Sequence, residues 1–187
     1  SEAMFAASAG LPVLAGLDGP SSPGHPAADG ARLALASLQW GTKFALSGVA
    51  AGLVTAPVSK GELAAIGWDY PGQTEFLADA CGQPYRDAVM MLAGPSLRTV
   101  PLTVHVSLAE VPGLLSADLI IHKARIVAAG LRRDFGISAP RLAIAALNPH
   151  AGEGGQFGDE EARIIAPAIA ALQAEGIDAF GPVPGDA

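Results

Sequence analysis

The sequence has few charged, aromatic or sulfur-containing residues. Of its 187 residues only 16% are charged and 5% are aromatic, and Cys81 is the single cysteine. One cysteine excludes an internal disulfide and is consistent with a reducing cytoplasm; we expect Cys81 to be a small buried core residue. The net charge of -7 lacks the basic excess that nucleic acid or an anionic membrane surface attracts. We therefore expect neither kind of partner.

Long hydrophobic runs are also missing. The most apolar stretch, residues 44–58, is interrupted by Ser47, Thr55 and Pro57, and a membrane-spanning helix needs about 20 apolar residues. Residues 1–10 have no basic segment followed by an apolar run, so we do not expect a signal peptide. Because 50% of the residues are hydrophobic, the chain can bury a core, and we expect a globular cytoplasmic protein.

From residue 27 onward the pattern predicts alternating helices and strands. We expect helices over 27–46, 74–80, 116–135 and 159–175, and strands over 49–55, 87–93, 97–106, 141–147 and 177–180. Such alternation favours parallel strands joined by crossover helices, and therefore an α/β/α sandwich. The sequence stops after a predicted strand and before a closing helix, so we expect the sandwich to be incomplete. Residues 1–26 are expected to form a flexible arm or loop.

The boundaries of two of these helices have local signals. Ser116 is expected to cap the helix over 116–135 and Gly136 to end it. In the helix over 159–175, Asp159, Glu160 and Glu161 occupy the first turn, where carboxylates are favoured by the helix dipole. Pro167 is expected to bend that helix without ending it.

The strongest local motif is Asn-Pro-His-Ala-Gly-Glu-Gly-Gly-Gln-Phe-Gly, residues 148–158, between a predicted strand and a predicted helix. Ligands in open α/β sheets bind outside the carboxyl ends of strands, and glycines let the backbone approach a ligand closely. The spacing is not that of the Gly-x-Gly-x-x-Gly dinucleotide motif. From the residues alone, a ligand loop and a plain glycine-rich turn are equally open.

Two histidines stand at predicted strand ends. Alternation along 97–106 places Thr103 and His105 on one face, and His150 lies in the loop after the strand over 141–147. If these strands are neighbours, the two imidazoles would converge and could bind a divalent metal. Without a third ligand, the residues alone favour ordinary polar histidines at strand ends.

Two further segments carry polar residues at turns. In Gly-Gln-Thr-Glu, residues 72–75, Thr74 is either a helix N-cap, the plainer interpretation, or a substrate contact. Lys60, after an expected strand, either meets an anionic group or reaches solvent, and solvent is the plainer interpretation.

These segments in this order resemble the 4-hydroxythreonine-4-phosphate dehydrogenase family. The matching segments are Leu-Val-Thr-Ala-Pro-Val-Ser-Lys-Gly (53–61), Tyr-Pro-Gly-Gln-Thr-Glu-Phe-Leu (70–77), Val-Met-Met-Leu-Ala (89–93), Thr-Val-His-Val-Ser-Leu (103–108), Leu-Asn-Pro-His-Ala-Gly-Glu-Gly-Gly (147–155) and Gly-Pro-Val-Pro-Gly-Asp (181–186). The resemblance covers residues 27–187 and implies the central α/β portion of such an enzyme, with the family's N- and C-terminal parts absent.

The resemblance implies an activity. The family oxidises 4-phosphooxy-threonine with NAD or NADP, and decarboxylation then gives 3-amino-2-oxopropyl phosphate for vitamin B6 biosynthesis. It implies a fold of the isocitrate and isopropylmalate dehydrogenase-like type and a homodimer. The substrate would be a small phosphorylated hydroxy amino acid.

The resemblance also implies site residues. The family's metal is held by three histidines, and two of these positions match His105 and His150, which favours metal ligands over the plainer interpretation. The divalent ion would be zinc, cobalt or magnesium. The family's Gly-His-Thr-Glu segment matches residues 72–75, which implies that Gln73 and Thr74 contact the substrate.

The sequence departs from the family pattern in two ways. Gln73 replaces a histidine and cannot become cationic, so a related dehydrogenase acting on a dihydrodiol carboxylate or another phosphorylated hydroxy acid is an alternative. The third metal histidine, the downstream substrate contacts and the N-terminal glycine-rich segment have no counterpart. We therefore expect this chain alone to be catalytically weak or inactive, and a non-catalytic dimerisation or ligand-binding module is a further alternative.

Overall fold

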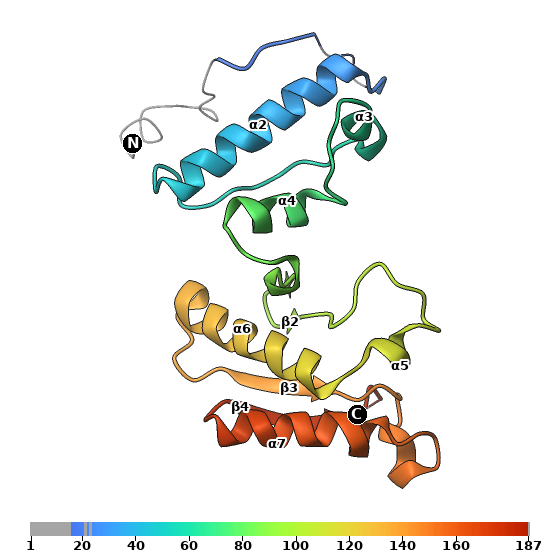
Figure 1. The fold of residues 1–187 in the computed structure, drawn as a ribbon. Helices are drawn as coiled ribbons and strands as arrows, with labels where there is room; N and C mark the ends of the chain where they lie inside the picture. The colour runs from blue at the N-terminus through green and yellow to red at the C-terminus, as the bar shows by residue number, and fades with distance from the viewer. Residues whose placement is uncertain (1–15, 21, 23, 187) are drawn as a thin grey trace. The chain divides into compact units, whose positions relative to one another are not determined.

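The computed structural model describes residues 16–20, 22 and 24–186, which fall into two compact units. The boundary between the units lies between Tyr85 and Arg86. Figure 1 shows the helices of the first unit in blue and green and the mixed elements of the second in yellow to red. Among the described residues, no helix is both long and apolar enough to span a membrane.

The first unit is helical. Its elements are α2 (Ala28–Leu46), α3 (Lys60–Ala65) and α4 (Gln73–Ala80). The two longer helices confirm the expectation from apolar spacing, and α2 packs against α3. Trp68, Tyr70 and Phe76 form an aromatic cluster with ring centroids 5.1 to 5.5 Å apart, which fixes the loop before α4 to that helix.

Two predictions for the first unit are wrong. No strand forms over residues 49–55: residues 49–51 form a bend, residues 52–55 have no regular structure, and Val49 and Val54 are 75% and 98% exposed. Its apolar composition indicated burial in a sheet, but no described strand of this unit lies beside it to accept its backbone hydrogen bonds. Cys81, expected in the core, is exposed as the C-cap of α4.

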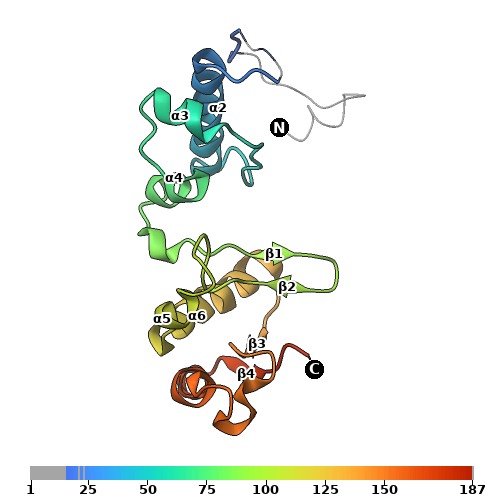
Figure 2. The ribbon, with the colours of Figure 1, turned by 90° about the vertical axis from the view of Figure 1, so that its right-hand side faces the viewer.

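The second unit begins with a short antiparallel hairpin. Strand β1 (Leu92–Ala93) pairs with β2 (Arg98–Thr99), as Figure 2 shows. The expected strands over 87–93 and 97–106 are therefore mostly wrong, because residues 100–110 leave the pairing and turn toward the short helix α5 (Val111–Leu114). The alternation that placed Thr103 and His105 on one strand face does not apply to the folded chain.

The remainder of the second unit is a parallel pair of strands with two helices. Helix α6 (Ala117–Phe135) leads into β3 (Arg141–Ala145), and α7 (Ala166–Ala174) leads into β4 (Asp178–Val183). The two strands pair in parallel, with Leu142 opposite Ala179. This connection, strand to helix to parallel strand, is the α/β arrangement expected from the sequence.

Helix α6 has the expected ends. The Ser116 hydroxyl accepts a hydrogen bond from the Leu119 N–H at 3.2 Å, and Gly136 closes the helix in the left-handed conformation with φ 66°. The helix over 159–175 is less regular than expected. A π-helical turn, η3 (Glu161–Ile165), runs directly into α7, so Pro167, which has no N–H to donate, lies within a continuous helical stretch that it does not end.

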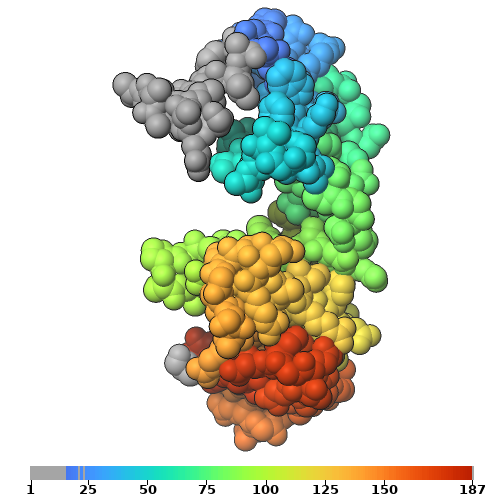
Figure 3. Space-filling view, turned by 90° about the vertical axis from the view of Figure 1, so that its left-hand side faces the viewer, coloured from blue at the N-terminus to red at the C-terminus, as the bar shows by residue number. Residues whose placement is uncertain are grey.

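The core of the second unit lies between α6, α7 and one face of the strand pair. Its buried members are Ile120, Ala124, Ala128, Leu131, Leu142, Ile164, Ile165, Ala168, Ile169, Leu172, Ile177 and Ala179. The space-filling view in Figure 3 shows α6, in yellow to orange, lying against α7, in red. The small residues Ala128 and Ala168, both fully buried, allow this close approach of the two helices.

Only one face of the parallel strand pair is covered. Leu142 and Ala179 are buried under the helices, whereas Arg141, Ala143 and Ala145 are exposed. Strand residues alternate between faces, so both helices cover the same face. The described residues of the second unit therefore form two layers, and the third layer of the expected sandwich is not formed within this unit.

Candidate active site

The loop after β3 has a tightly specified backbone. Asn148 accepts a hydrogen bond on Oδ1 from the His150 N–H at 2.9 Å and donates from Nδ2 to the Phe157 carbonyl at 3.3 Å. Its side chain thereby ties the start of the loop to its end. The short turn η2 (Ala151–Gly155) follows His150, and Ala151 and Glu153 adopt positive φ values of 51° and 42°.

His150 is paired with a carboxylate from the end of the neighbouring strand. Its Nδ1 lies 2.9 Å from Oδ2 of Asp186, and the Gly185 N–H donates to the Pro149 carbonyl at 2.9 Å. The loops after the parallel strands β3 and β4 therefore meet at the carboxyl ends of the strands, where α/β sheets bind ligands. With Nδ1 occupied by Asp186, Nε2 of the half-exposed ring remains available for a ligand.

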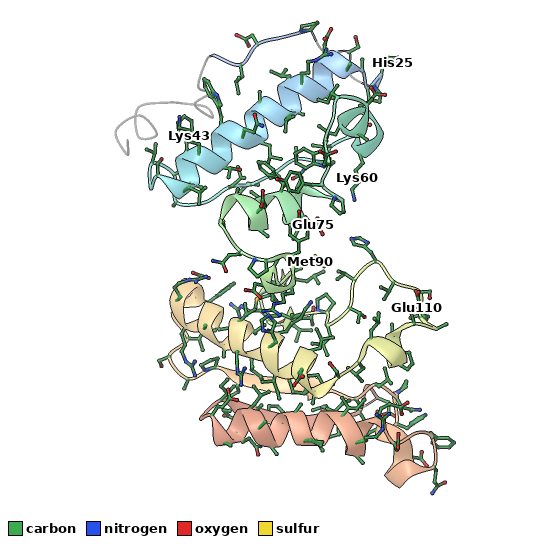
Figure 4. The ribbon with its side chains drawn as sticks, in the orientation of Figure 1. His25, Lys43, Lys60, Glu75, Met90 and Glu110 are labelled. Atoms are coloured by element: carbon green, nitrogen blue, oxygen red, sulfur yellow. The ribbon has the colours of Figure 1, made fainter. Side chains whose placement is uncertain are left out.

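His105 lies in a bend between β2 and α5 and is exposed. Its backbone is left-handed, with φ 58°. The turn that follows is closed by Glu110 (labelled in Figure 4), which accepts hydrogen bonds from the Ser107 hydroxyl at 2.7 Å and the Ser107 N–H at 3.0 Å. These two bonds, the hydroxyl first, lower the pKa of Glu110 below its ordinary value.

Backbone strain gathers at the two candidate histidines. Among the described residues, the non-glycine residues with positive φ are His105, Ala151 and Glu153. A left-handed conformation is unfavourable for residues with a Cβ atom, and such strain tends to cluster at functional sites. One strained residue is His105 itself, and another immediately follows His150.

The donor set for a metal is only partly present. The described residues contain no group of three or more His, Cys, Asp or Glu side chains that could hold a metal ion. The His150 ring with its carboxylate partner has the chemistry of one metal ligand and its orienting group. That His105 and His150 share one ion stays a prediction.

The segment 72–75 lies in the first unit. Gly72, not Thr74, is the N-cap of α4, so the capping interpretation of Thr74 is wrong. Gln73 donates from Nε2 to the Ala56 carbonyl at 3.1 Å, and this bond joins segment 72–75 to segment 53–61. The substrate contacts predicted for Gln73 and Thr74 stay predictions.

Lys60 and Glu75 approach the same glycine. A Cβ atom added at Gly72 would lie 3.1 Å from Oε2 of Glu75 and 3.6 Å from Nζ of Lys60. Figure 4 labels both side chains, one from α3 and one from α4. Two segments recognised in the sequence are therefore adjacent within this unit, with Gln73 and Lys60 as their polar side chains.

Residues 3–187 match the family described as "Pyridoxal phosphate biosynthetic protein PdxA". The chain belongs to this family. A similar relative is a 4-hydroxythreonine-4-phosphate dehydrogenase of Erythrobacter litoralis, 63% identical over 177 residues, which are 95% of this chain and 53% of the relative. The chain thus spans about half the length of the curated relatives it matches.

Solved structures give the same family. The 4-hydroxythreonine-4-phosphate dehydrogenase of Klebsiella pneumoniae has a TM-score of 0.81 and 40% identity, covering 87% of this chain and 48% of that one. A terephthalate 1,2-cis-dihydrodiol dehydrogenase of Burkholderia xenovorans is more distant, with a TM-score of 0.63 and 31% identity, covering 89% of this chain and 52% of that one. Both relatives are named as dehydrogenases, so the family's members include oxidoreductases.

Proposed function

We propose that this chain forms part of the active site of a dehydrogenase that oxidises 4-phosphooxy-threonine with NAD or NADP and then decarboxylates it to 3-amino-2-oxopropyl phosphate in vitamin B6 biosynthesis. The observation that carries the proposal is the pairing of His150 Nδ1 with Asp186 at 2.9 Å, at the carboxyl ends of two parallel strands. In this proposal the working enzyme is a cytoplasmic homodimer with an α/β/α sandwich of the isocitrate dehydrogenase-like type.

His105 and His150 are proposed to hold a divalent cation. When bound, the cation would lower the pKa of the substrate hydroxyl for oxidation and stabilise the enolate formed on decarboxylation. Asp186 Oδ2 lies 2.9 Å from Nδ1 of His150, and a carboxylate there favours the tautomer protonated on Nδ1, which would leave the Nε2 lone pair for the cation. The hydride chemistry belongs to the nicotinamide, and the protein's part is to position it.

Gln73 and Thr74 are proposed to contact the substrate. The Gln73 amide already donates one hydrogen bond to the Ala56 carbonyl, so one N–H and its oxygen remain for a ligand. The Gln73 amide is uncharged, and it would donate a neutral hydrogen bond to a phosphate or carboxylate. A protonated histidine at the same position would supply a stronger, charge-assisted bond.

A second candidate is a dehydrogenase for a dihydrodiol carboxylate. It is favoured by Gln73, which departs from the family histidine, and by the likeness to the terephthalate dihydrodiol dehydrogenase structure. The higher identity and TM-score of the Klebsiella pneumoniae enzyme favour the phosphorylated amino acid. The two functions differ in the anionic group that residues 72–75 would meet.

The variant Gln73→His tests this choice of substrate. The measurement is kcat/KM for NAD or NADP reduction, with 4-phosphooxy-threonine and with a cis-dihydrodiol carboxylate, in an enzyme of the relatives' full length containing this segment. We expect the phosphorylated amino acid to be preferred, and Gln73→His to raise its kcat/KM by about fivefold, since a charged partner adds roughly 1 kcal/mol to a hydrogen bond.

The matched control is Gln83→His, at an exposed position just after the turn that follows α4. The same substitution there should leave both values of kcat/KM unchanged. Faster turnover of the dihydrodiol carboxylate by the unsubstituted enzyme would replace the first proposed function by the second.

A further inference from the structure

Glu161 is a buried carboxylate beneath the His150 loop. Glu161 is the first residue of the π-helical turn η3 and is only 6% exposed. Oε1 accepts two backbone hydrogen bonds, from the Leu147 N–H at 3.0 Å and the Asn148 N–H at 2.9 Å. These are consecutive amides where the chain leaves β3 and enters the loop.

The loop is wrapped closely around this carboxylate. Gly152 is buried with φ 71°, and a Cβ atom there would lie 2.9 Å from Oε2 of Glu161 and 3.1 Å from the Gly158 carbonyl oxygen. Only a glycine fits this position without displacing the carboxylate. Oε2 itself is buried and has no hydrogen-bond partner among the described residues.

Two hydrogen bonds connect Glu161 to His150. The first joins Oε1 to the Asn148 N–H, and the second joins Asn148 Oδ1 to the His150 N–H at 2.9 Å. Asn148 also bonds the Phe157 carbonyl at the far end of the loop. A shift of the Glu161 carboxylate would therefore move Asn148, and with it the backbone that carries the histidine.

Burial of the Glu161 carboxylate is not expected to raise the free energy of unfolding. A carboxylate taken out of water with one oxygen unbonded is costly, and an apolar side chain of similar volume often serves a core at least as well. The carboxylate provides one acceptor oxygen, Oε1, toward which the N–H groups of Leu147 and Asn148 both point. That fixes the exit of the chain from β3 into a loop with several left-handed residues.

We propose that Glu161 is a positioning residue, which acts through Asn148 to hold His150 in the orientation needed for a divalent cation. This inference rests on the proposed function, because His150 is a metal ligand only there. Glu161 does not itself touch the ion or the substrate in this account. Outer partners that orient metal ligands typically contribute about 10–100-fold to metal affinity.

Two measurements on the 187-residue chain test the proposal. Titration with zinc ion alone gives the affinity for the cation, and amide hydrogen exchange gives the protection of the Leu147 and Asn148 N–H groups. We expect Glu161→Ala to weaken zinc binding at least about tenfold and to accelerate exchange at both amides. Glu161→Gln keeps an acceptor oxygen at the same place and should restore part of both.

Two control variants separate positioning from general destabilisation. Glu160→Ala makes the same change at the adjacent residue, and Ile169→Val lowers stability in the same core without substituting a loop residue. Both should keep the zinc affinity of the unsubstituted chain. If Glu161→Ala binds zinc as tightly as the unsubstituted chain, or if Ile169→Val loses as much affinity, the positioning role is overturned.

Failure of the proposed function has a different signature. If the unsubstituted chain binds no zinc, the cation site is wrong, and the assignment of Glu161 to that site falls with it. Amide exchange then still decides whether the carboxylate holds the loop. Faster exchange at Leu147 and Asn148 in Glu161→Ala alone supports that holding role, and unchanged exchange overturns it.

Discussion

Replacing Leu172 by alanine is expected to lower the free energy of unfolding of the second unit by about 2–5 kcal/mol, the range for removing a fully buried leucine side chain. Leu172 is 0% exposed and lies in α7 within the core that joins α6, α7 and the parallel strands. The loss combines the transfer of buried apolar atoms with the cavity left between two helices. Urea denaturation followed by circular dichroism measures it.

The matched control is Leu97→Ala in the hairpin between β1 and β2. Leu97 is 66% exposed, so the same truncation should change the free energy of unfolding by less than about 0.5 kcal/mol. Equal losses for the two variants would mean that α7 does not pack on the strands as described.

Gly181→Ala is expected to have an effect of similar size for a different reason. Gly181 lies in β4 with φ 131°, and a Cβ atom there would collide with the Ile144 carbonyl oxygen and lie 3.0 Å from the Val183 nitrogen. Both neighbours are backbone atoms of the paired strands, so neither can move aside without breaking the pairing. Strain and overlap together should cost roughly 2–4 kcal/mol.

Gly185→Ala provides the control for this substitution. A Cβ atom at Gly185 would make only an ordinary contact, 3.8 Å from Cα of Pro149. Thermal denaturation of both variants should show a marked decrease in Tm for Gly181→Ala and little change for Gly185→Ala. A Gly181→Ala variant as stable as the unsubstituted chain would contradict the described path of β4 past Ile144.

The helices were predictable because their signals are local. Ser116 and Gly136 lie directly at the ends of α6, and each acts through hydrogen bonds within one turn of the helix. The apolar spacing of α2 likewise needs no distant residue. The position of the loop over 148–158 between a strand and a helix also follows from local sequence, since its glycines and its neighbours define it.

The strands were less predictable because a strand depends on its partner. Residues 49–55 and 100–106 have the composition and alternation of strands, but neither pairs with a described strand. A short apolar run indicates that the segment prefers to be buried, but it does not indicate which strand would pair with it. The prediction that Cys81 is buried is wrong for a similar reason, since a single small residue does not indicate what surrounds it.

Only part of the candidate site follows from the sequence. Family resemblance singled out His105 and His150, but the pairing of His150 with Asp186 depends on two parallel strands placing their ends together. Asp186 belonged to a recognised segment without an assigned role. The sequence indicates only a first-turn carboxylate at Glu161, because its two hydrogen bonds to the residues after β3 form only when the helix folds back over the strand.

A zinc titration of the chain followed by NMR of its four histidine rings tests whether His105 and His150 bind one cation together. We expect one equivalent of zinc to shift the ring resonances of His105 and His150 together. His122, whose Nε2 lies 2.8 Å from Asp87, should not respond, and neither should His25. A response of His150 without His105, or of neither ring, would contradict a shared metal site.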